Sequence, residues 1–519
     1  MQLTEFRNEP LCDFKGNPEH ERRMKEALDE VRQELGQEYD LVIKGERIKT
    51  QDKFYSYNPG QKDQAVGAFS KADAELADRA IRAADEAFKI WSHTPAEQRA
   101  ELALETARII RERKFHFAAW MCYEVGKTWA EADADVAEAI DFAEFYGREI
   151  LRLDQPQPLT SVYGERNSLR YLPLGVGVVI PPWNFPLAIL TGMTLASVVA
   201  GNTVVLKPSS DSPVIGYKLF EALEEVGMPP GVVNFLPGPG GSVGDVLVGH
   251  PRTRFVAFTG SKEVGLRVNL VAAKTAPGQI WVKRVIAEMG GKNSIVVDSE
   301  ADLEAAVEGV TVSAFGYQGQ KCSACSRAIV VESVYEAFLE KLQSRVEQIR
   351  VGAATHLNNY MGPVINARAK QSIREYIEIG KKEGRLITGG EEAPGPGHFI
   401  QPTVIADVAP QARIAQEEIF GPVLAVLKAR NFDEALEIAN NTEYGLTGAV
   451  YTKNRSKMDK AAEDFFVGNL YFNRKCTGAL VGGHPFGGFN MSGTDSKAGG
   501  RDYLLLFTQA KVVSEKLAP

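Results

Sequence analysis

YLPLGVGVVIPPWNFPLAILTGMTLASVVAGNTVVL, residues 171–206, is the stretch that decides the fold of this chain. It is apolar and long enough to raise the question of a membrane span, but four prolines and four glycines interrupt it. Apolar runs at 176–180 and 203–206 flank a segment at 186–200 that has the length of a buried helix. We therefore expect a strand, a helix and a second strand here.

The same alternation of apolar runs with helical segments continues along the chain and predicts parallel sheets covered by helices on both faces. The unit that contains 171–206 goes on with a helix near 212–226, the runs VVNFL (232–236) and RFVAFTG (254–260), and a helix at 261–273. A second series follows Glu288, with NSIVV (293–297), a helix near 301–315, RAIVV (327–331), a helix near 333–349, GAVYT (448–452) and a helix at 455–465. The sequence therefore predicts two α/β units.

Other segments belong to neither series. Three of them, at 72–91, 95–113 and 130–151, carry apolar residues at helical spacing and predict surface helices. NSLRYLPLG (167–175) and LLLFTQAKVVSEKL (504–517) are typical of strands. Strands outside both sheets favour an arm that pairs with another subunit.

Composition limits the classes of function. The 519 residues correspond to about three domains, and the net charge of −8 argues against a nucleic-acid partner. The N-terminal residues mix charges and lack the apolar core of a signal peptide. Five cysteines, an odd number and mostly far apart, do not resemble a disulfide framework. A cytoplasmic, reducing location fits, with no membrane or nucleic-acid partner.

FGYQGQKCSACSR, residues 315–327, places Cys322 and Cys325 three positions apart. Such a pair can be a redox couple, half of a zinc site, or one working thiol beside a bystander. A zinc site needs about four Cys or His ligands at suitable spacing, which the scattered histidines do not offer. A single nucleophile needs a base and donors for an oxyanion. Glu288 and Asn184 are candidates, although each alone is typical of a surface acid or a turn residue.

Two glycine-rich turns, GPGGSVG (238–244) and FTGSKEVG (258–265), each follow an apolar run and open a helix. Free N–H groups and the helix dipole attract an anion at such a point, although chain reversal is the commoner explanation of either turn alone. Lys207 follows the run TVVL, at the edge where α/β sheets bind ligands. The combination favours a ligand that carries phosphate.

Seven motifs resemble the aldehyde dehydrogenase superfamily in order and spacing: PWNFP, GNTVVLKPS, FTGSKEVG, EMGGKN, GQKCSA, EEIFGPV and PFGGFNMSG. The resemblance covers nearly the whole chain and implies an α/β fold with two Rossmann-type domains, a β oligomerisation arm and a homo-oligomer, either a dimer or an assembly of dimers. It implies an N-terminal arm at 1–37, a dinucleotide-binding domain at 38–154 and 174–287, a catalytic domain at 288–490, and oligomerisation strands at 155–173 and 503–519.

Further motifs, among them FRNEP, GQKCSACSR, YIEIGKKEG and GNLYFNRKCTGALVG, resemble the monofunctional family members that oxidise L-glutamate 5-semialdehyde. This substrate, in equilibrium with 1-pyrroline-5-carboxylate, gives L-glutamate in the second step of proline degradation. A dehydrogenase for another small semialdehyde, such as succinate semialdehyde, is the alternative, and it would need a basic side chain for the carboxylate. A non-catalytic relative is a further alternative, which the joint presence of Cys322, Glu288 and Asn184 disfavours.

Carried over position by position, the resemblance makes Cys322 the nucleophile, because it stands in G-Q-x-C, and leaves Cys325 outside the motif. The Asn184 amide and the Cys322 backbone N–H would hold the oxyanion of a thiohemiacetal. Glu288 would activate the water that hydrolyses the thioester formed by hydride transfer, and it is also a candidate acceptor of the thiol proton. The resemblance implies no metal.

NAD is the cofactor that the resemblance implies. Lys207 would bind the adenine ribose, Ser261 the pyrophosphate and Glu418 the nicotinamide ribose. Phe420 would pack near the nicotinamide ring and Trp183 near the phosphates.

Two glycines and one serine complete the expected cofactor site. Gly260 and Gly265 would let the backbone approach the phosphates. Many NAD-selective relatives carry Glu where this chain has Ser210. The loss of that negative charge predicts that NADP is accepted alongside NAD.

A substrate with a carboxylate and an ammonium group needs donors at one point and a carboxylate at another. The resemblance suggests Ser323 with the backbone amides of Gly478 and Ala479 for the carboxylate. It suggests Glu138 for the ammonium group, although this residue alone is typical of a solvated helix acid. CTGALVGG (476–483) has the composition of an anion-binding nest. The apolar walls of the pocket would be Phe185 and Phe486.

Overall fold

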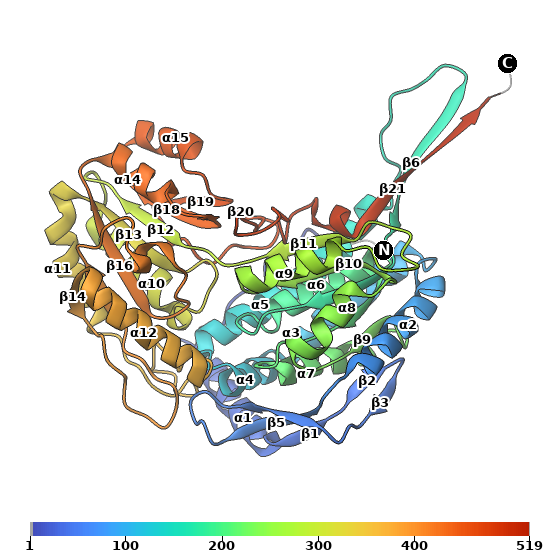
Figure 1. Cartoon of the computed structure of the whole chain (residues 1–519), viewed down its shortest axis with the longest axis horizontal. Coiled ribbons are helices and arrows are strands. Elements are labelled where there is room, and N and C mark those ends of the chain that lie inside the picture. The colour runs from blue at the N-terminus through green and yellow to red at the C-terminus, as the bar shows by residue number, and fades with distance from the viewer. Residues whose placement is uncertain (1–3, 518–519) are drawn as a thin grey trace.

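Two seven-stranded sheets dominate the computed structural model, which describes residues 4–517 (Figure 1). The first sheet has the order β11-β10-β7-β8-β9-β2-β3. Its strands are β2 (Leu41–Ile43), β3 (Glu46–Ile48), β7 (Val176–Ile180), β8 (Thr203–Leu206), β9 (Val233–Phe235), β10 (Thr253–Thr259) and β11 (Arg284–Glu288). From β11 to β9 the strands are parallel, and β2 and β3 continue antiparallel. The α/β unit predicted around residues 171–206 is confirmed.

The second sheet has the order β14-β15-β16-β13-β12-β18-β19. Its strands are β12 (Asn293–Val297), β13 (Cys325–Val331), β14 (Arg385–Thr388), β15 (Thr403–Ala406), β16 (Val423–Ala429), β18 (Thr447–Tyr451) and β19 (Asn469–Phe472). All neighbours are parallel except β14 and β15. The sequence predicts β12, β13 and β18 but not the other four, so the second α/β unit is confirmed and is larger than expected.

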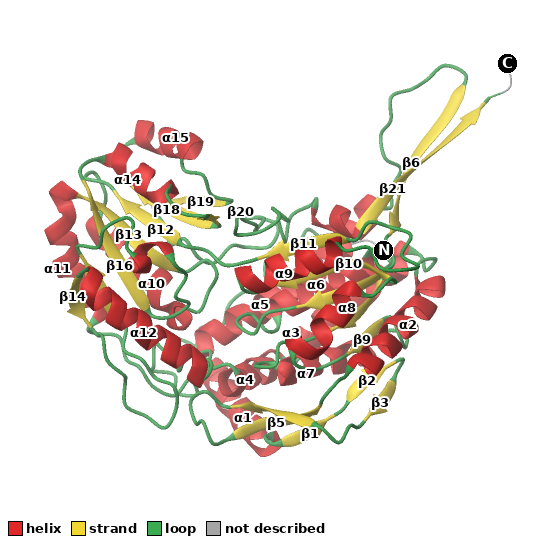
Figure 2. Ribbon diagram, in the orientation of Figure 1, coloured by secondary structure: helices red, strands yellow, loops and turns green. Residues whose placement is uncertain are grey.

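Helices cover both faces of the first sheet (Figure 2). The helices on the sheet are α2 (Ala74–Trp91), α6 (Ala188–Val199), α7 (Pro213–Glu225), α8 (Asp245–Gly249) and α9 (Lys262–Ala273). A further layer, α3 (Ala96–Glu112), α4 (Lys114–Glu124) and α5 (Trp129–Leu153), packs on α6 and α7. Val204 and Leu206 of β8 face a core that contains α5 and α6, whereas Val205 faces one that contains α2 and α9. This alternation explains the continuous apolar runs, because strands buried on both faces need apolar residues at every position.

The second sheet is covered in the same way by α10 (Leu303–Phe315), α11 (Tyr335–Val346), α12 (Ala367–Glu383), α13 (Arg413–Gln416), α14 (Phe432–Asn440) and α15 (Arg455–Asp464). The N-terminal part adds α1 (Pro18–Glu34) and a three-stranded sheet of β1 (Gln37–Tyr39), β4 (Lys53–Tyr57) and β5 (Ala65–Ser70). Helix α1 lies within the predicted N-terminal arm, yet Met24, Leu28 and Val31 pack into the first core. A short pair, β17 (Tyr444–Gly445) with β20 (Phe489–Asn490), lies near the site described below.

Asn202 fixes the two ends of the stretch that decides the fold. Its Oδ1 accepts hydrogen bonds from the backbone N–H groups of Leu174 and Gly175, at 2.7 and 2.9 Å. Its Nδ2 donates to the carbonyl of Phe507 at 2.9 Å, near the C-terminus. Among residues 4–517, no helix has the length and apolar character to cross a membrane.

Two strands leave the body of the molecule as a projecting ribbon (Figure 1). They are β6 (Glu165–Pro173) and β21 (Thr508–Lys516), which pair antiparallel along their whole length. The predicted strand at 504–517 is wrong at its start, because Tyr503–Phe507 forms a 3₁₀ helix. Tyr503, Leu504 and Phe507 lie on one face of that turn and are buried in the first core. Residues 1–3 and 518–519 of the predicted arm and strand lie outside the described residues.

Candidate active site

Cys322 lies at the carboxyl edge of the first sheet, in the loop that precedes β13, and lines a cavity of about 110 Å³. Glu288, the last residue of β11, lines the same cavity. The other lining residues that the sequence predicts are Glu138, Phe185, Ser323, Gly478, Ala479 and Phe486. Those that it does not predict are Phe142, Tyr146, Ile189, Gly192, Met193, Thr259, Ala498 and Tyr503. Residues from six separate parts of the sequence, 138–146, 185–193, 259, 288, 322–323 and 478–503, therefore meet at one cavity.

The loop before the thiol is held in an unusual backbone conformation. Tyr317 and Gln318 have φ values of 49° and 56°, in the left-handed region that non-glycine residues rarely adopt. Gln318 Nε2 donates to the carbonyl of Pro363 at 2.8 Å, and its Oε1 accepts from the N–H of Gly362 at 2.9 Å. Strained residues of this kind persist where surrounding contacts over-determine them, and they cluster at functional sites.

Asn293 holds the backbone of the segment that carries Cys322. Its Nδ2 donates to the carbonyls of Cys322 at 2.7 Å and Ala324 at 2.9 Å, and its Oδ1 accepts from the N–H of Thr447 at 3.0 Å. The sequence analysis missed this role. The available signal was position, since Asn293 ends the EMGGKN motif and begins a strand predicted to be buried.

Asn184 lies in the loop between β7 and α6 and is 4% exposed. Its Nδ2 donates to the carbonyl of Gln320 at 3.1 Å, which joins it to the segment that carries Cys322. A carboxamide has two N–H donors, so one remains for an oxyanion. The start of α6 is fixed by Asp135, whose carboxylate accepts from the N–H of Ala188 at 2.7 Å.

Burial favours the uncharged forms of the Cys322 thiol and the Glu288 carboxyl, the two groups expected to exchange a proton. Burial raises the pKa of the Cys322 thiol to about 12, and the nearby Glu418 and Glu288 carboxylates add to the rise. Burial also raises the pKa of Glu288 to about 7, against the lowering effect of hydrogen bonds from Ser496. The thiol therefore needs a base, and Glu288 has a pKa suited to that task near neutral pH.

Cys325 has different surroundings. It begins β13 and is buried in the second core, where its Sγ donates to the carbonyl of Arg327 at 3.4 Å. Its side chain also forms a hydrogen bond with that of Cys476. Cys322 lines the cavity and Cys325 does not, so the arrangement disfavours a redox couple between them.

The expected cofactor residues lie along the same edge of the first sheet. Lys207, after β8, is 4% exposed, and burial lowers the pKa of its ammonium group to about 8. Its Nζ donates to the carbonyl of Pro208 at 3.2 Å. Ser261 caps α9 and accepts from the N–H of Val264. A buried lysine and a helix N-terminus at the same edge of one sheet suit the hydroxyl groups and phosphates of a dinucleotide.

Glu418 closes the other side of that site. Its Oε1 accepts from the N–H of Gly291 at 3.0 Å, and a Cβ on Gly290 would lie 2.0 Å from its Oε2, so a larger residue there would displace this carboxylate. The rings of Trp183 and Phe420 meet edge to face with centroids 5.6 Å apart. Burial raises the pKa of Glu418 to about 7. The donor set therefore fits NAD.

The remaining predicted cofactor positions, Gly260, Gly265 and Ser210, also make contacts within the protein. A Cβ on Gly265 would lie 2.4 Å from Met289 Sδ, so glycine lets α9 pack closely on the sheet. The N–H of Gly260 donates to the carbonyl of Glu288 at 3.1 Å, which links the cofactor turn to the proposed base. Ser210 Oγ donates to the carbonyl of Gly238 at 3.5 Å.

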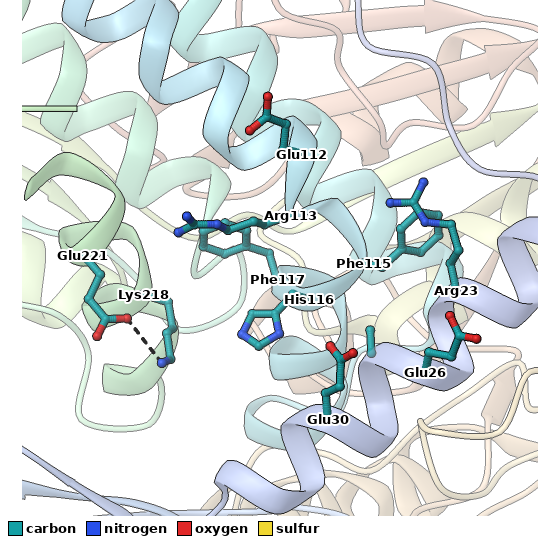
Figure 3. A pocket seen from close by; sticks show the side chains of 11 residues that line it. Arg23, Glu26, Glu30, Glu112, Arg113, Phe115, His116, Phe117, Lys218 and Glu221 are labelled. Carbon is teal, nitrogen blue, oxygen red and sulfur yellow. Dashed lines mark ion pairs between the residues drawn. The ribbon is translucent and has the colours of Figure 1, made fainter. Parts of the chain in front are cut away.

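A larger cavity, of about 550 Å³, lies between α1, α4 and α7, on residues that the sequence does not predict (Figure 3). Lys218 pairs with Glu221 at 3.2 Å within the cavity, and Glu26, Glu112 and Arg113 pair with residues outside it. His116 accepts a hydrogen bond from the Trp120 indole at 3.0 Å. None of the cysteines lines it. Charged side chains paired in this way are typical of a solvated surface.

The family model for the aldehyde dehydrogenase family matches residues 47–513. The chain belongs to the aldehyde dehydrogenase family. It is 60% identical over 510 residues to 1-pyrroline-5-carboxylate dehydrogenase of Geobacillus kaustophilus (strain HTA426), covering 98% of this chain and 99% of that one. It is 56% identical over 513 residues to 1-pyrroline-5-carboxylate dehydrogenase 1 of Halalkalibacterium halodurans, covering 99% of both. A crystal structure of 1-pyrroline-5-carboxylate dehydrogenase from Thermus with bound NAD has a TM-score of 0.98 and 52% identity, with full coverage of both chains. The fold class expected from the sequence is confirmed.

Proposed function

We propose that this chain oxidises L-glutamate 5-semialdehyde, in equilibrium with 1-pyrroline-5-carboxylate, to L-glutamate with NAD, as the second step of proline degradation. The observation that carries the proposal is the single cavity that joins Cys322 and Glu288 to a separate set of polar groups. The relatives that bear the name 1-pyrroline-5-carboxylate dehydrogenase support it.

The polar end of the cavity suits an α-amino acid. Gly478 has a φ of 73°, and the N–H groups of Gly478 and Ala479 donate to no described residue. Arg474 donates to the carbonyls of Thr477 and Gly478, both at 3.0 Å, and these two hydrogen bonds hold the turn in place. Two free amides and the Ser323 hydroxyl form an anion-binding nest for the substrate carboxylate.

Glu138 supplies the charge for the substrate ammonium group. Burial, reinforced by Asp135, raises the pKa of its carboxyl to about 8. An ammonium group beside it would favour the ionised form, so substrate and carboxylate would stabilise each other. Among the described residues, no Lys or Arg lines the cavity, which disfavours a semialdehyde that carries a carboxylate alone.

The chemistry follows from the residues around Cys322. The thiolate, formed by proton transfer to Glu288, adds to the aldehyde carbon, and the Asn184 amide with the Cys322 N–H holds the oxyanion. When bound, NAD supplies the hydride acceptor, and Lys207, Ser261 and Glu418 would hold it. After the proton taken from the thiol has passed to solvent, the Glu288 carboxylate takes a proton from water, the water oxygen attacks the thioester carbon, and the C–S bond breaks to release the acid and the Cys322 thiolate.

The proposal also includes a cytoplasmic location and a homo-oligomeric assembly. The described residues include five free cysteines, dispersed as a reducing, cytoplasmic location would allow. The ribbon of β6 and β21 supports a homo-oligomer, because an isolated two-stranded ribbon is marginally stable in water.

The test is NAD reduction with a panel of semialdehydes. We expect the highest kcat/KM for L-glutamate 5-semialdehyde. Glu138→Gln should raise KM for that substrate at least about tenfold, because it removes a charged hydrogen-bond partner, with little change for an uncharged aldehyde such as butanal. A higher kcat/KM for succinate semialdehyde would contradict the substrate assignment.

A further inference from the structure

A loop that contains residues 492–497 runs beside Glu288 at the end of β11 and extends the first sheet. The N–H of Thr494 donates to the carbonyl of Ala287 at 2.9 Å, and the N–H of Met289 donates to the carbonyl of Ser492 at 2.7 Å. Glu288 itself bridges to Gly493 as an isolated antiparallel pair. The loop therefore runs beside the end of β11 and is fixed to it at three successive residues.

One residue of this loop reaches the carboxylate. Ser496 Oγ donates to Glu288 Oε1 at 2.5 Å, and the Ser496 backbone N–H donates to the same oxygen at 3.3 Å. Ser496 is 4% exposed. The second oxygen, Oε2, has no hydrogen-bond partner among the described residues. One oxygen of the proposed base is thus held and the other is left open.

The loop holds this serine in a strained backbone. Its neighbours Asp495 and Lys497 have φ values of 54° and 49°, both in the left-handed region. Lys497 Nζ donates to the carbonyls of Gly468 at 2.8 Å and Gly487 at 2.9 Å, and it lies 3.3 Å from Asp495. Two strained residues on either side of one serine need such compensating contacts, and strain of this kind marks functional loops.

We infer that Ser496 is a positioning residue for the base: its hydroxyl and N–H hold Oε1 of Glu288 so that Oε2 is left for the water that hydrolyses the thioester. This inference rests on the proposed function, in which Glu288 activates that water. The proton passes from water to Oε2, the water oxygen bonds to the thioester carbon, and Cys322 leaves as thiolate.

Several ionisable groups face Glu288. Lys497 lies on the same loop, Cys322 on the loop before β13, Tyr503 on the 3₁₀ helix, and Glu138 across the cavity on α5. Against the rise caused by burial, the hydrogen bonds from Ser496 lower the pKa of Glu288 because they favour the carboxylate, and the backbone of Gly488 and the charge of Lys497 lower it further. Removal of the serine hydroxyl should therefore raise that pKa.

The direct test titrates Glu288 by infrared difference spectroscopy, with Glu288→Gln as the blank that identifies its carboxyl band. In Ser496→Ala, we expect the midpoint to move up by about one pH unit relative to the wild type, since one strong hydrogen bond to the charged form is lost. Ser496→Thr, which keeps the hydroxyl, should restore it. This measurement needs neither aldehyde nor NAD, so its outcome is independent of the proposed function.

The kinetic test follows kcat against pH. The acid limb of Ser496→Ala should move up by the same amount, and kcat should approach the wild-type value at high pH, where the base is ionised in both. A merely structural role would lower kcat at every pH. Ser492→Ala is the matched control, because Ser492 is a fully buried serine of the same loop whose hydroxyl accepts from the N–H of Gly445 rather than contacting Glu288. An unmoved Glu288 midpoint in Ser496→Ala, or an equal movement in Ser492→Ala, overturns the inference.

Discussion

Cys322 and Cys325 are close in sequence but differ in what they contact. Cys322 lines the cavity, and Cys325 is packed among the apolar residues of the second core. Cys322→Ala should lower kcat/KM by at least about a thousandfold, because no covalent intermediate can form. Cys325→Ala should retain most activity at a cost of about 1 kcal/mol in stability. NAD reduction assays decide this, and equal losses in the two variants would revive a dithiol mechanism.

Glu288 is expected to act mainly in the second half of the reaction. In Glu288→Gln, NADH should appear in a burst about equal to the enzyme, and steady turnover should then collapse because water is no longer activated. The burst should be slower than in the wild type, since the high pKa of the Cys322 thiol leaves little thiolate without a base. Stopped-flow absorbance measures both phases. Unchanged steady turnover would remove Glu288 from the mechanism.

Ser210 is expected to decide between NAD and NADP. A carboxylate about 5 Å from a phosphate charge, at an effective dielectric near 20, costs on the order of 3 kcal/mol as an upper bound. The wild type should therefore accept NADP. Ser210→Glu should lower kcat/KM for NADP at least about tenfold, with a much smaller change for NAD. Steady-state kinetics with both cofactors is the check, and a wild type inactive with NADP contradicts the idea.

Residue chemistry was the most predictable level of this molecule. All six expected substrate residues line the cavity that holds Cys322 and Glu288. Asn293 and Ser496 escaped prediction because their roles depend on backbone carbonyls and a carboxylate that lie far away in sequence. The position of Asn293 in the sequence marks it as a buried polar residue but does not identify the carbonyls that it contacts, and nothing in the sequence around Ser496 identifies Glu288 as its partner.

A buried ion pair joins several elements of the site. Lys127 Nζ lies 3.1 Å from Asp135 Oδ2 on α5, with both side chains fully buried, and 4.1 and 4.4 Å from the ring centres of Phe185 and Tyr317. Lys127→Met should cost about 3–5 kcal/mol in stability, because it leaves a buried carboxylate unpaired.

Urea denaturation measures this cost. The double variant Lys127→Met with Asp135→Asn should regain part of the loss, since the uncompensated charge is then gone. Lys89→Met, at an exposed position of α2, is the matched control and should change stability by less than about 0.5 kcal/mol. A loss of unfolding free energy in Lys127→Met no larger than in Lys89→Met would show that the ion pair does not stabilise the fold.

Elements with strong periodicity were predicted, and those set by tertiary context were not. Helices α2, α3 and α5 follow their apolar stripes closely. LLLF at 504–507 looks like a strand, yet it continues a 3₁₀ turn because its burial against α5 and α6 outweighs β propensity. Strands β14 and β15 have only four residues each and are separated by an irregular loop, so no alternation marks them.

At the scale of the whole molecule, the site lies where the carboxyl edge of the first sheet faces loops from the second domain. The general rule that α/β sheets bind ligands at their carboxyl edges predicts the location. It does not predict which loop of the partner domain closes over it. That depends on the long segment from β19 to β21, which carries Gly478, Ala498 and Tyr503 to the cavity and then returns to the first domain.

The ribbon of β6 and β21 gives the prediction for assembly. Val512 and Val513 of β21 are 60% and 47% exposed. The strand pairs only with β6, so its other edge is free. A projecting two-stranded ribbon with exposed valines and free edges is unstable alone and suits pairing with a second copy. Residues 503–507 belong to the core, where Asn202 and Arg284 bind the carbonyls of Phe507 and Leu506. Deletion of residues 508–519 should therefore dissociate the oligomer without unfolding the subunit.

Light scattering gives the mass, and near-ultraviolet circular dichroism reports whether the core around Tyr503 and Phe507 is kept. The matched control is the double variant Lys511→Ala with Lys516→Ala, which alters exposed charges of β21 but leaves its strand and valines in place. We expect subunit mass for the deletion and wild-type mass for the control, because backbone pairing and apolar burial rather than lysine charge hold the copies together. A deletion variant that keeps both its native spectrum and the wild-type mass would show that the ribbon is not the element that joins the subunits.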